Sequence, residues 1–304
     1  MHIWQPEPGE TLLGRTPITF ASGAAMRVRG MRWFRDAERN DIQGELPGWP
    51  EGPAYTPRST GESVARNSIK GAAMALGAAV MGILGSAGGN ISGTYGDTSG
   101  KDTSDDRADE VEDFPVLWAA PGTIARTLPW QLDPGRSGEK HYRTHAIVTD
   151  RRLVIVGLLY HKKDDKLIED ETLWEIPRSH IGRIERRDFK DGQDVKISFT
   201  DASWCRLSSF RREKLTRYLL HPLDLVPLGS LTPAQRSAVE DFVATAHAPD
   251  VGTPVVDRRP SGHYRVEVPV PSELSSFFGS NSRSMIMNSD GAQVQPKDVR
   301  PEDL

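Results

Sequence analysis

The chain has 304 residues, of which 37% are hydrophobic, and its formal net charge is −4 at pH 7. This length allows one or two domains, and so small a net charge does not favour a nucleic acid or another polyanion as partner. The single cysteine, Cys205, excludes a disulfide framework and suits the cytosol. The N-terminus lacks the basic and apolar regions of a signal peptide, so we expect a cytoplasmic protein.

Residues 1–58 are rich in proline, glycine, tryptophan and arginine, and no hydrophobic period is sustained there. We therefore expect an irregular N-terminal segment. Short extended pieces are compatible with Thr11–Phe20 and Ala25–Phe34.

A Gly/Ala-rich apolar helix is predicted over residues 59–89. Ser59 and Glu62 have the spacing of a capping box, in which each side chain bonds the other residue's backbone N–H. The apolar residues after it recur at helical spacing, as in a helix pair. The small residues that would allow another helix to approach closely are Gly71, Ala75, Ala78, Gly82, Gly85 and Gly89.

Gly71–Gly89 carries no charge and is long enough to cross a bilayer core of about 30 Å. It holds only four Leu, Ile or Val residues, so its transfer into lipid is weakly favourable. Four interpretations remain open: a single membrane span, a helix inserted shallowly or as a hairpin, a self-associating soluble helix, and a helix packed on the β domain of the same chain.

Residues 90–113 begin with small polar residues and end in acids. The part from 97 to 113 has eight Asp or Glu against two Lys or Arg. Almost no apolar residues interrupt it. This composition predicts a flexible, disordered acidic linker, with a domain boundary near Asp113.

From Phe114 onwards the pattern predicts β-structure. Val116–Leu128 is a candidate first strand, and Tyr142–Thr149 with Leu153–Tyr160 predicts a hairpin. Strands are also expected at the following segments: Thr172–Ile176, Ile181–Arg187, Val195–Phe199 and Trp204–Ser209.

Two helices are predicted after these strands, at Arg211–Leu220 and Thr232–His247. In the second, Thr232 is a cap residue followed by Pro233 at the first helical position. Residues 248–304 are expected to form a mostly disordered tail, with one edge strand at Tyr264–Val268.

The stretches THAIVTDRRLVIVGL (144–158), ETLWEIPRSHIGRIERRD (171–188) and DVKISFTDASWCRLSSF (194–210), followed by a helix, resemble the bacterial pleckstrin-homology-like (GRAM-related) family over about 115–247. The resemblance implies a mainly β domain at 114–247, a PH-like bent antiparallel sandwich or barrel closed by a C-terminal helix. Either predicted helix could be that closure.

Members of this family are binding modules without catalysis, so the resemblance implies the same role for this chain. We expect a non-catalytic binding or scaffold protein at the inner face of the membrane, associated through helix 59–89. The alternative is a soluble adaptor that self-associates or binds a partner protein through the same helix. An enzyme is the third and least favoured class.

A basic set on the β domain is the candidate site for an anionic ligand or an anionic membrane surface. Alternatively, these residues form a solvated surface paired with neighbouring acids. The set consists of Arg178, Arg183, Arg186, Arg187, Lys190, Arg211, Arg212 and Lys214, with Arg217 beside them.

No motif favours catalysis, a metal or a cofactor. Ser137 to Lys140 matches S-x-x-K but has no K-T-G downstream. His141 and His145 would lie roughly 13 Å apart on a strand, too far to share a metal. Cys205, next to Trp204 on a strand, is expected to be a core or half-buried thiol. We therefore assign no catalytic residue, metal ligand or cofactor.

Overall fold

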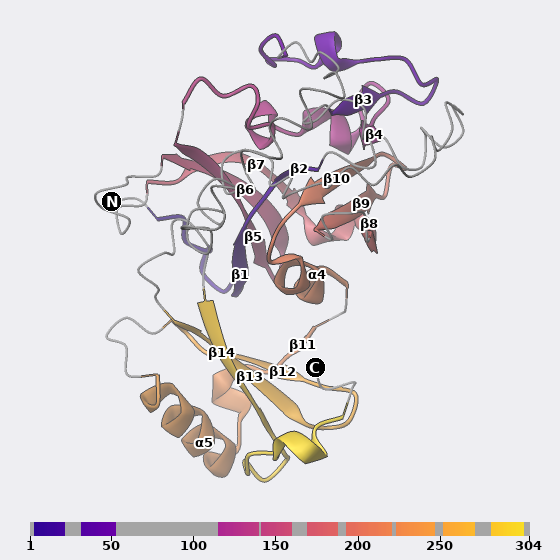
Figure 1. The fold of residues 1–304 in the computed structure, drawn as a ribbon. Helices are drawn as coiled ribbons and strands as arrows, with labels where there is room; N and C mark the ends of the chain where they lie inside the picture. Colours follow the sequence, from indigo (N-terminus) through magenta and orange to yellow (C-terminus); the bar gives the residue numbers. More distant parts are fainter. Residues whose placement is uncertain are drawn as a thin grey trace, which may run out of the picture.

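The computed structural model describes residues 3–21, 32–52, 115–139, 141–159, 169–187, 193–220, 223–246, 252–270 and 281–300. Over these ranges the protein is mainly β, with antiparallel sheets and two α-helices (Figure 1). None of its described helices has the length and apolar character needed to cross a membrane. The predicted helix at 59–89 and the acidic linker at 90–113 lie outside these ranges.

A four-stranded antiparallel sheet, sheet 1, contains the predicted hairpin. Its strands, in spatial order, are β1 (Leu12–Pro17), β5 (Tyr142–Thr149), β6 (Arg152–Leu159) and β7 (Glu171–Pro177). Both hairpin strands are almost continuously buried, and Asp150 and Arg151 form the turn between them. Burial on both faces explains why their sequences are apolar throughout rather than alternating.

Sheet 2 lies against sheet 1. Its strands, in spatial order, are β3 (Trp33–Arg35), β4 (Pro115–Trp118), β10 (Trp204–Ser208), β9 (Asp194–Phe199) and β8 (Ile181–Arg187), and β2 (Thr19–Phe20) also pairs with β10. β3 and β4 are parallel, whereas the other pairs are antiparallel. β4 is shorter than predicted because Pro121 and Gly122 follow it, and Gly122 has a positive φ of 78°.

Short 3₁₀ turns complete the connections within the described ranges. They are η1 (Gln43–Glu45), η2 (Ile124–Thr127), η3 (Trp130–Leu132), η4 (Arg178–His180), η5 (Leu228–Ser230) and η6 (Pro296–Asp298).

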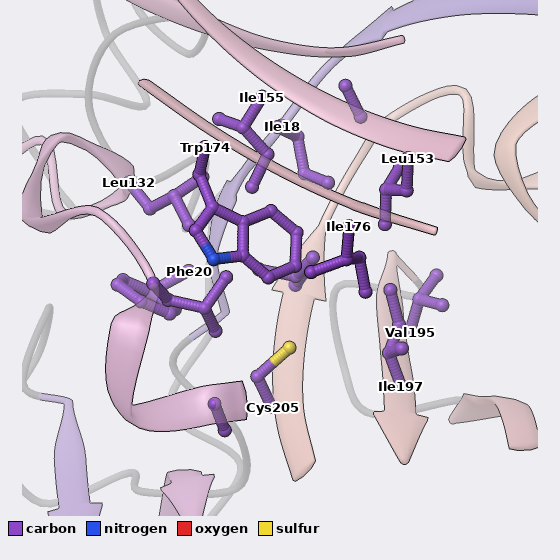
Figure 2. Close-up of a cluster of buried hydrophobic side chains, with 14 of the residues drawn as sticks. Ile18, Phe20, Leu132, Leu153, Ile155, Trp174, Ile176, Val195, Ile197 and Cys205 are labelled. Atoms are coloured by element: carbon purple, nitrogen blue, oxygen red, sulfur yellow. The ribbon is translucent and has the colours of Figure 1, made fainter. Parts of the chain in front are cut away.

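The main hydrophobic core fills the space between sheets 1 and 2. Figure 2 shows Trp174 of β7 surrounded by apolar side chains from both sheets, among them Ile155 and Ile197. The indole Nε1 donates to Thr127 Oγ1 at 2.8 Å, which satisfies the one polar atom of this ring. Cys205 lies in the same core and is fully buried, as its place on a strand predicted.

The prediction of an irregular segment at 1–58 was wrong for β1, β2 and β3. β1 lies within the extended piece expected at Thr11–Phe20, but it pairs with β5 and is buried along most of its length. A strand buried on both faces shows no alternation in its sequence. Its polar residues Arg15 and Thr16 are buried because their partners come from distant parts of the chain.

Two ionic contacts fasten the N-terminal segment to sheet 1. The Arg15 guanidinium forms a bidentate pair with Asp170 at 2.6 and 2.7 Å, and its Nε donates to His145 Nδ1 at 2.8 Å. Asp170 also accepts from the backbone N–H of Trp4 at 2.8 Å. Arg152 forms the second contact, with the buried carboxylate of Glu10 at 2.9 Å.

The two α-helices belong to different parts of the fold. α4 (Arg212–Leu220) contacts β1 and β5 of sheet 1 and β8 and β9 of sheet 2. α5 (Pro233–Ala244) instead packs on a third sheet through Val239. Its capping box, formed by Thr232 and Gln235 with Pro233 after the cap, agrees with the predicted start of this helix.

Sheet 3 corrects the prediction of a mostly disordered tail at 248–304. Its antiparallel strands, in spatial order, are β11 (Asp224–Leu225), β12 (Val255–Arg258), β13 (Tyr264–Val270) and β14 (Asn281–Met287). β13 is therefore an inner strand, not the edge strand expected at Tyr264–Val268. The first half of β14 is polar and predicts no strand, but a seven-residue register with β13 orders it.

We predict that Asp170→Asn destabilises the protein by about 3–5 kcal/mol, because it leaves the buried Arg15 guanidinium without its counter-charge. The measurement is the free energy of unfolding in urea. Glu185→Gln is the matched control, since it removes the carboxylate of an ion pair whose Arg183 side chain is 75% exposed. This control should cost less than about 1 kcal/mol. Equal losses for both variants would contradict the role given to Asp170.

Candidate anion-binding surface

The structure distributes the predicted basic residues over three places. Arg186, Arg187 and Arg212 meet where β8 contacts α4, and Arg183 lies farther along β8. Lys214 and Arg217 lie on the side of α4 that faces sheet 3. Arg178 lies apart from both groups in η4, and Lys190 is outside the described residues.

At the junction of β8 and α4, arginines and acids alternate. Arg186 forms an ion pair with Glu213 of α4, and Arg212 donates to the carbonyl oxygen of Arg187 at 3.0 Å. Arg183 pairs with Glu185 at 2.7 Å. Among the described residues, the four arginines thus lie near three carboxylates, because Asp194 is the cross-strand partner of Arg187, and the excess of positive charge is small. Exposed pairs of this kind contribute little to stability, so they can be exchanged for a ligand at small cost.

Next to these arginines, Lys196 of β9, Trp204 of β10 and Trp118 of β4 lie on neighbouring strands of sheet 2. The β8–β9 register sets Glu185 opposite Lys196, whose Nζ lies 4.3 Å from the centre of the Trp204 ring. The Trp204 ring stacks in parallel on that of Trp118, with centroids 6.1 Å apart. Rings beside cations combine apolar area with charge. We call the four arginines, Lys196 and these two tryptophans the basic–aromatic face.

Lys214 and Arg217 are turned away from this face. The Nζ of Lys214 lies 3.4 Å from Ser282 Oγ of β14, and Arg217 lies 3.8 Å from the Glu267 carboxylate of β13. Burial lowers the pKa of Lys214 to about 8; Glu267 opposes this shift, while Arg211 and Arg217 add to it. Burial also lowers the pKa of Arg211.

Arg178 has a structural environment of its own. It donates to the carbonyl oxygen of Thr149 at 3.2 Å, beside the turn of the β5–β6 hairpin. Burial lowers its pKa, and the nearby Asp150 carboxylate opposes that shift. The structure therefore does not bring Arg178 together with the other predicted residues.

The described residues offer little for covalent chemistry. Burial raises the pKa of the Cys205 thiol, with the Asp194 carboxylate adding to the effect, so the thiolate is strongly disfavoured. Within the described ranges, no cluster of His, Cys, Asp and Glu could hold a metal ion. A small pocket lies between Thr19, Gln131, Ser137, Tyr142 and Arg143.

The six small residues predicted for helix association, Gly71 to Gly89, lie outside the described residues. Sequence reasoning missed the charged residues of sheet 3, Arg265 and Glu267, as part of any site. Their alternation with Val266 and Val268 was visible in the sequence, and it signals a strand with a polar face. The same pattern could not show that α4 packs against this polar face.

Comparison of the chain with protein families, with curated proteins and with solved structures found no match.

The lowered pKa of Lys214 predicts a pH-dependent stability. Between pH 8 and 10.5 the unfolded chain carries a proton on this lysine that the folded chain has lost, so the contribution of Lys214 to the free energy of unfolding rises with pH in that window. Lys214→Met removes this contribution. The free energy of unfolding of the variant should therefore exceed that of the native protein most below pH 8, and this difference should vanish towards pH 10.5.

Urea unfolding at several pH values, in a buffer free of phosphate, measures this effect. The pKa of Tyr218 is raised by burial and by the Glu267 carboxylate, so near pH 10 this residue loses its proton only in the unfolded chain and lowers the stability of both proteins. This effect is common to the native protein and Lys214→Met, so it cancels in the difference between them. Lys297→Met is the control, since Lys297 is exposed and distant in sequence from Lys214. If the free energy of unfolding changes with pH in the same way for the native protein and Lys214→Met, the lowered pKa of Lys214 is wrong.

Proposed function

We propose that this chain is a non-catalytic binding or scaffold protein, built on a PH-like module that meets an anionic membrane surface with its basic–aromatic face. In this proposal the predicted helix at 59–89 supplies the membrane attachment at the inner face. The proposal requires no metal, cofactor or catalytic residue.

The strand order carries the proposal. The consecutive strands β5, β6 and β7 of sheet 1 are followed along the chain by the three antiparallel strands β8, β9 and β10 of sheet 2, and then directly by α4. β1 completes sheet 1, while β2, β3 and β4, which lie between β1 and β5 along the chain, join sheet 2. Because α4 contacts strands of both sheets, it is the better candidate for the closing helix of a PH-like module. α5 packs on sheet 3 and is not needed for that role.

The composition of the face adds support. Among the described residues of this surface, four arginines and Lys196 outnumber the carboxylates of Glu185, Glu213 and Asp194. An exposed basic residue near the membrane is attracted to anionic lipid by about 1 kcal/mol. Trp118, which is partly exposed, stands beside this charge. Indole rings favour the boundary between lipid and water.

The experiment compares three full-length proteins: the native chain, a deletion of Gly71–Gly89, and Arg183→Gln/Arg186→Gln/Arg212→Gln. Each is sedimented with vesicles of phosphatidylcholine alone and of phosphatidylcholine with phosphatidylglycerol, and the pellet is washed with carbonate. Glu213→Gln is the matched control, because it alters the same surface while raising its positive charge.

We expect the native chain to remain in the anionic pellet through the wash, and the deletion to bind only weakly and to be released. The triple variant should bind neutral and anionic vesicles alike, and Glu213→Gln should bind anionic vesicles at least as well as the native chain. If no protein sediments with either vesicle, the membrane role is wrong. The molecular mass of the native chain and the deletion in solution then tests the alternative, a soluble adaptor that self-associates through helix 59–89.

A further inference from the structure

The first residues of the chain cover the face of sheet 1 that points away from sheet 2. Trp4 packs there on Ile147, Val154 and Val156, in a hydrophobic cluster separate from the main core. These three aliphatic side chains are at most 1% exposed. Residues 3–9, which we call the N-terminal strap, thus help to keep an apolar strip of sheet 1 away from water.

The strap is fastened on both sides by ion-paired side chains. At its start, the Trp4 backbone N–H donates to Asp170 Oδ2 at 2.8 Å, and the same oxygen accepts from Arg15 Nη1 at 2.6 Å. Directly after the strap, Glu10 pairs with Arg152 at 2.9 Å. The position of Trp4 therefore depends on how Arg15 holds the Asp170 carboxylate.

A buried histidine completes the fastening at Trp4. His145 of β5 is 0% exposed, and its Nδ1 accepts from Arg15 Nε at 2.8 Å. A guanidinium can only donate hydrogen bonds, so this Nδ1 carries a lone pair and the bond requires the proton-free nitrogen. Protonation would set two N–H donors against each other. Because the guanidinium is a rigid plane, Arg15 cannot move its Nε away and keep both Nη bonds to Asp170 in place.

Among the described residues, the charged groups nearest to His145 on this face are two arginines and one carboxylate. Arg15 comes from β1, Arg143 lies two residues before His145 on β5, and Asp170 lies just before β7. The residues in the same row of the sheet are uncharged: Pro17, Val156 and Thr172. α4 packs on the opposite face of β1, against Gly14. An imidazolium would be a third cation beside a single carboxylate.

The acids nearest the other side of the strap lie at Arg152. Glu7, Glu10 and Glu175 all pair with this arginine. Burial opposes ionisation of Glu10, but hydrogen bonds from Arg152 and Thr149 outweigh it and lower the pKa of this carboxyl. Glu10 therefore remains charged in mild acid and keeps its hold on Arg152 when the contacts at Trp4 are lost.

We propose that His145 is an acid sensor that releases the N-terminal strap. At neutral pH the neutral imidazole holds Arg15 against Asp170, and the strap is closed. In mild acid, protonation of His145 expels Arg15, Asp170 no longer positions the Trp4 N–H, and residues 3–9 open about Glu10. The apolar strip of sheet 1 then becomes exposed. This device goes beyond the proposed function, because it involves neither helix 59–89 nor the basic–aromatic face.

NMR of the deuterated full-length protein tests the proposal through hydrogen exchange of the Trp4 amide. Exchange is measured at about pH 7.5 and about pH 5.5 and corrected for the intrinsic rate. If His145 has the ordinary pKa of about 6.5 in the open state and stays neutral in the closed state, opening is about tenfold more favourable at the lower pH. We therefore expect the protection of this amide to fall about tenfold, while the amides of β13 keep theirs.

His145→Gln provides the decisive comparison. The glutamine carbonyl can accept from Arg15 but cannot be protonated in this range, so protection of the Trp4 amide should differ by less than about twofold between the two pH values. His180→Gln is the matched control, since it makes the same change at an exposed histidine and should keep the tenfold fall. A tenfold fall in His145→Gln, or none in His180→Gln, would overturn the proposal.

The ring signal of His145 in the native protein gives a readout that does not depend on a variant folding. The ring should still be neutral at about pH 6 while the Trp4 amide is protected. Titration of His145 near pH 6.5 without loss of that protection would contradict the sensor. Unchanged protection of Trp4 between the two pH values would do the same. Equal losses at Trp4 and β13 would mean that acid acts on the whole fold, which also overturns the proposal.

Discussion

The bidentate ion pair between Arg15 and Asp170 is the interaction on which the arrangement of the two main sheets depends. It fixes β1 at the edge of sheet 1, and β1 continues through Ile18 into β2, which joins sheet 2. The same carboxylate accepts from the Trp4 backbone, so one buried acid orders the chain at both ends of this segment. A short N-terminal stretch without strand-like alternation thereby becomes part of the core.

α4 connects the remaining parts of the molecule. Its apolar side places Leu215 and Tyr218 in the core between sheets 1 and 2. Arg212 and Glu213 at its start meet β8, whereas Lys214 and Arg217 meet sheet 3. Gly14 of β1 permits this close packing, since a Cβ there would lie 3.2–3.3 Å from Tyr218 and Lys214 atoms. One nine-residue helix therefore presents separate groups of charge to two different surfaces.

The sequence predicted the strands whose pattern is local. The β5–β6 hairpin, the alternation of Val195, Ile197 and Phe199 in β9, and the cap of α5 all agree with the structure. β14 was missed, and β1 was expected only as a short extended piece of an irregular segment, because the order of both strands comes from pairing with β13 and β5, which no local pattern reveals. For the candidate site, spacing predicted that basic residues of β8 and α4 would meet. It could not predict that Lys214 faces sheet 3, of which only β13 was expected, as an edge strand.

The pairings of the N-terminal strands have a consequence for how the chain reaches this structure. Arg15 and Asp170 are 155 residues apart, and the bonded hydroxyls of Thr16 and Ser209 are 193 apart. Contacts of such long sequence separation slow folding, because the chain must close large loops before any contact forms. During synthesis, β1 and β2 must wait unpaired until β5 and β10 have been made. The exposed edges of these early strands are where a chaperone or an aggregating neighbour would first engage the nascent protein.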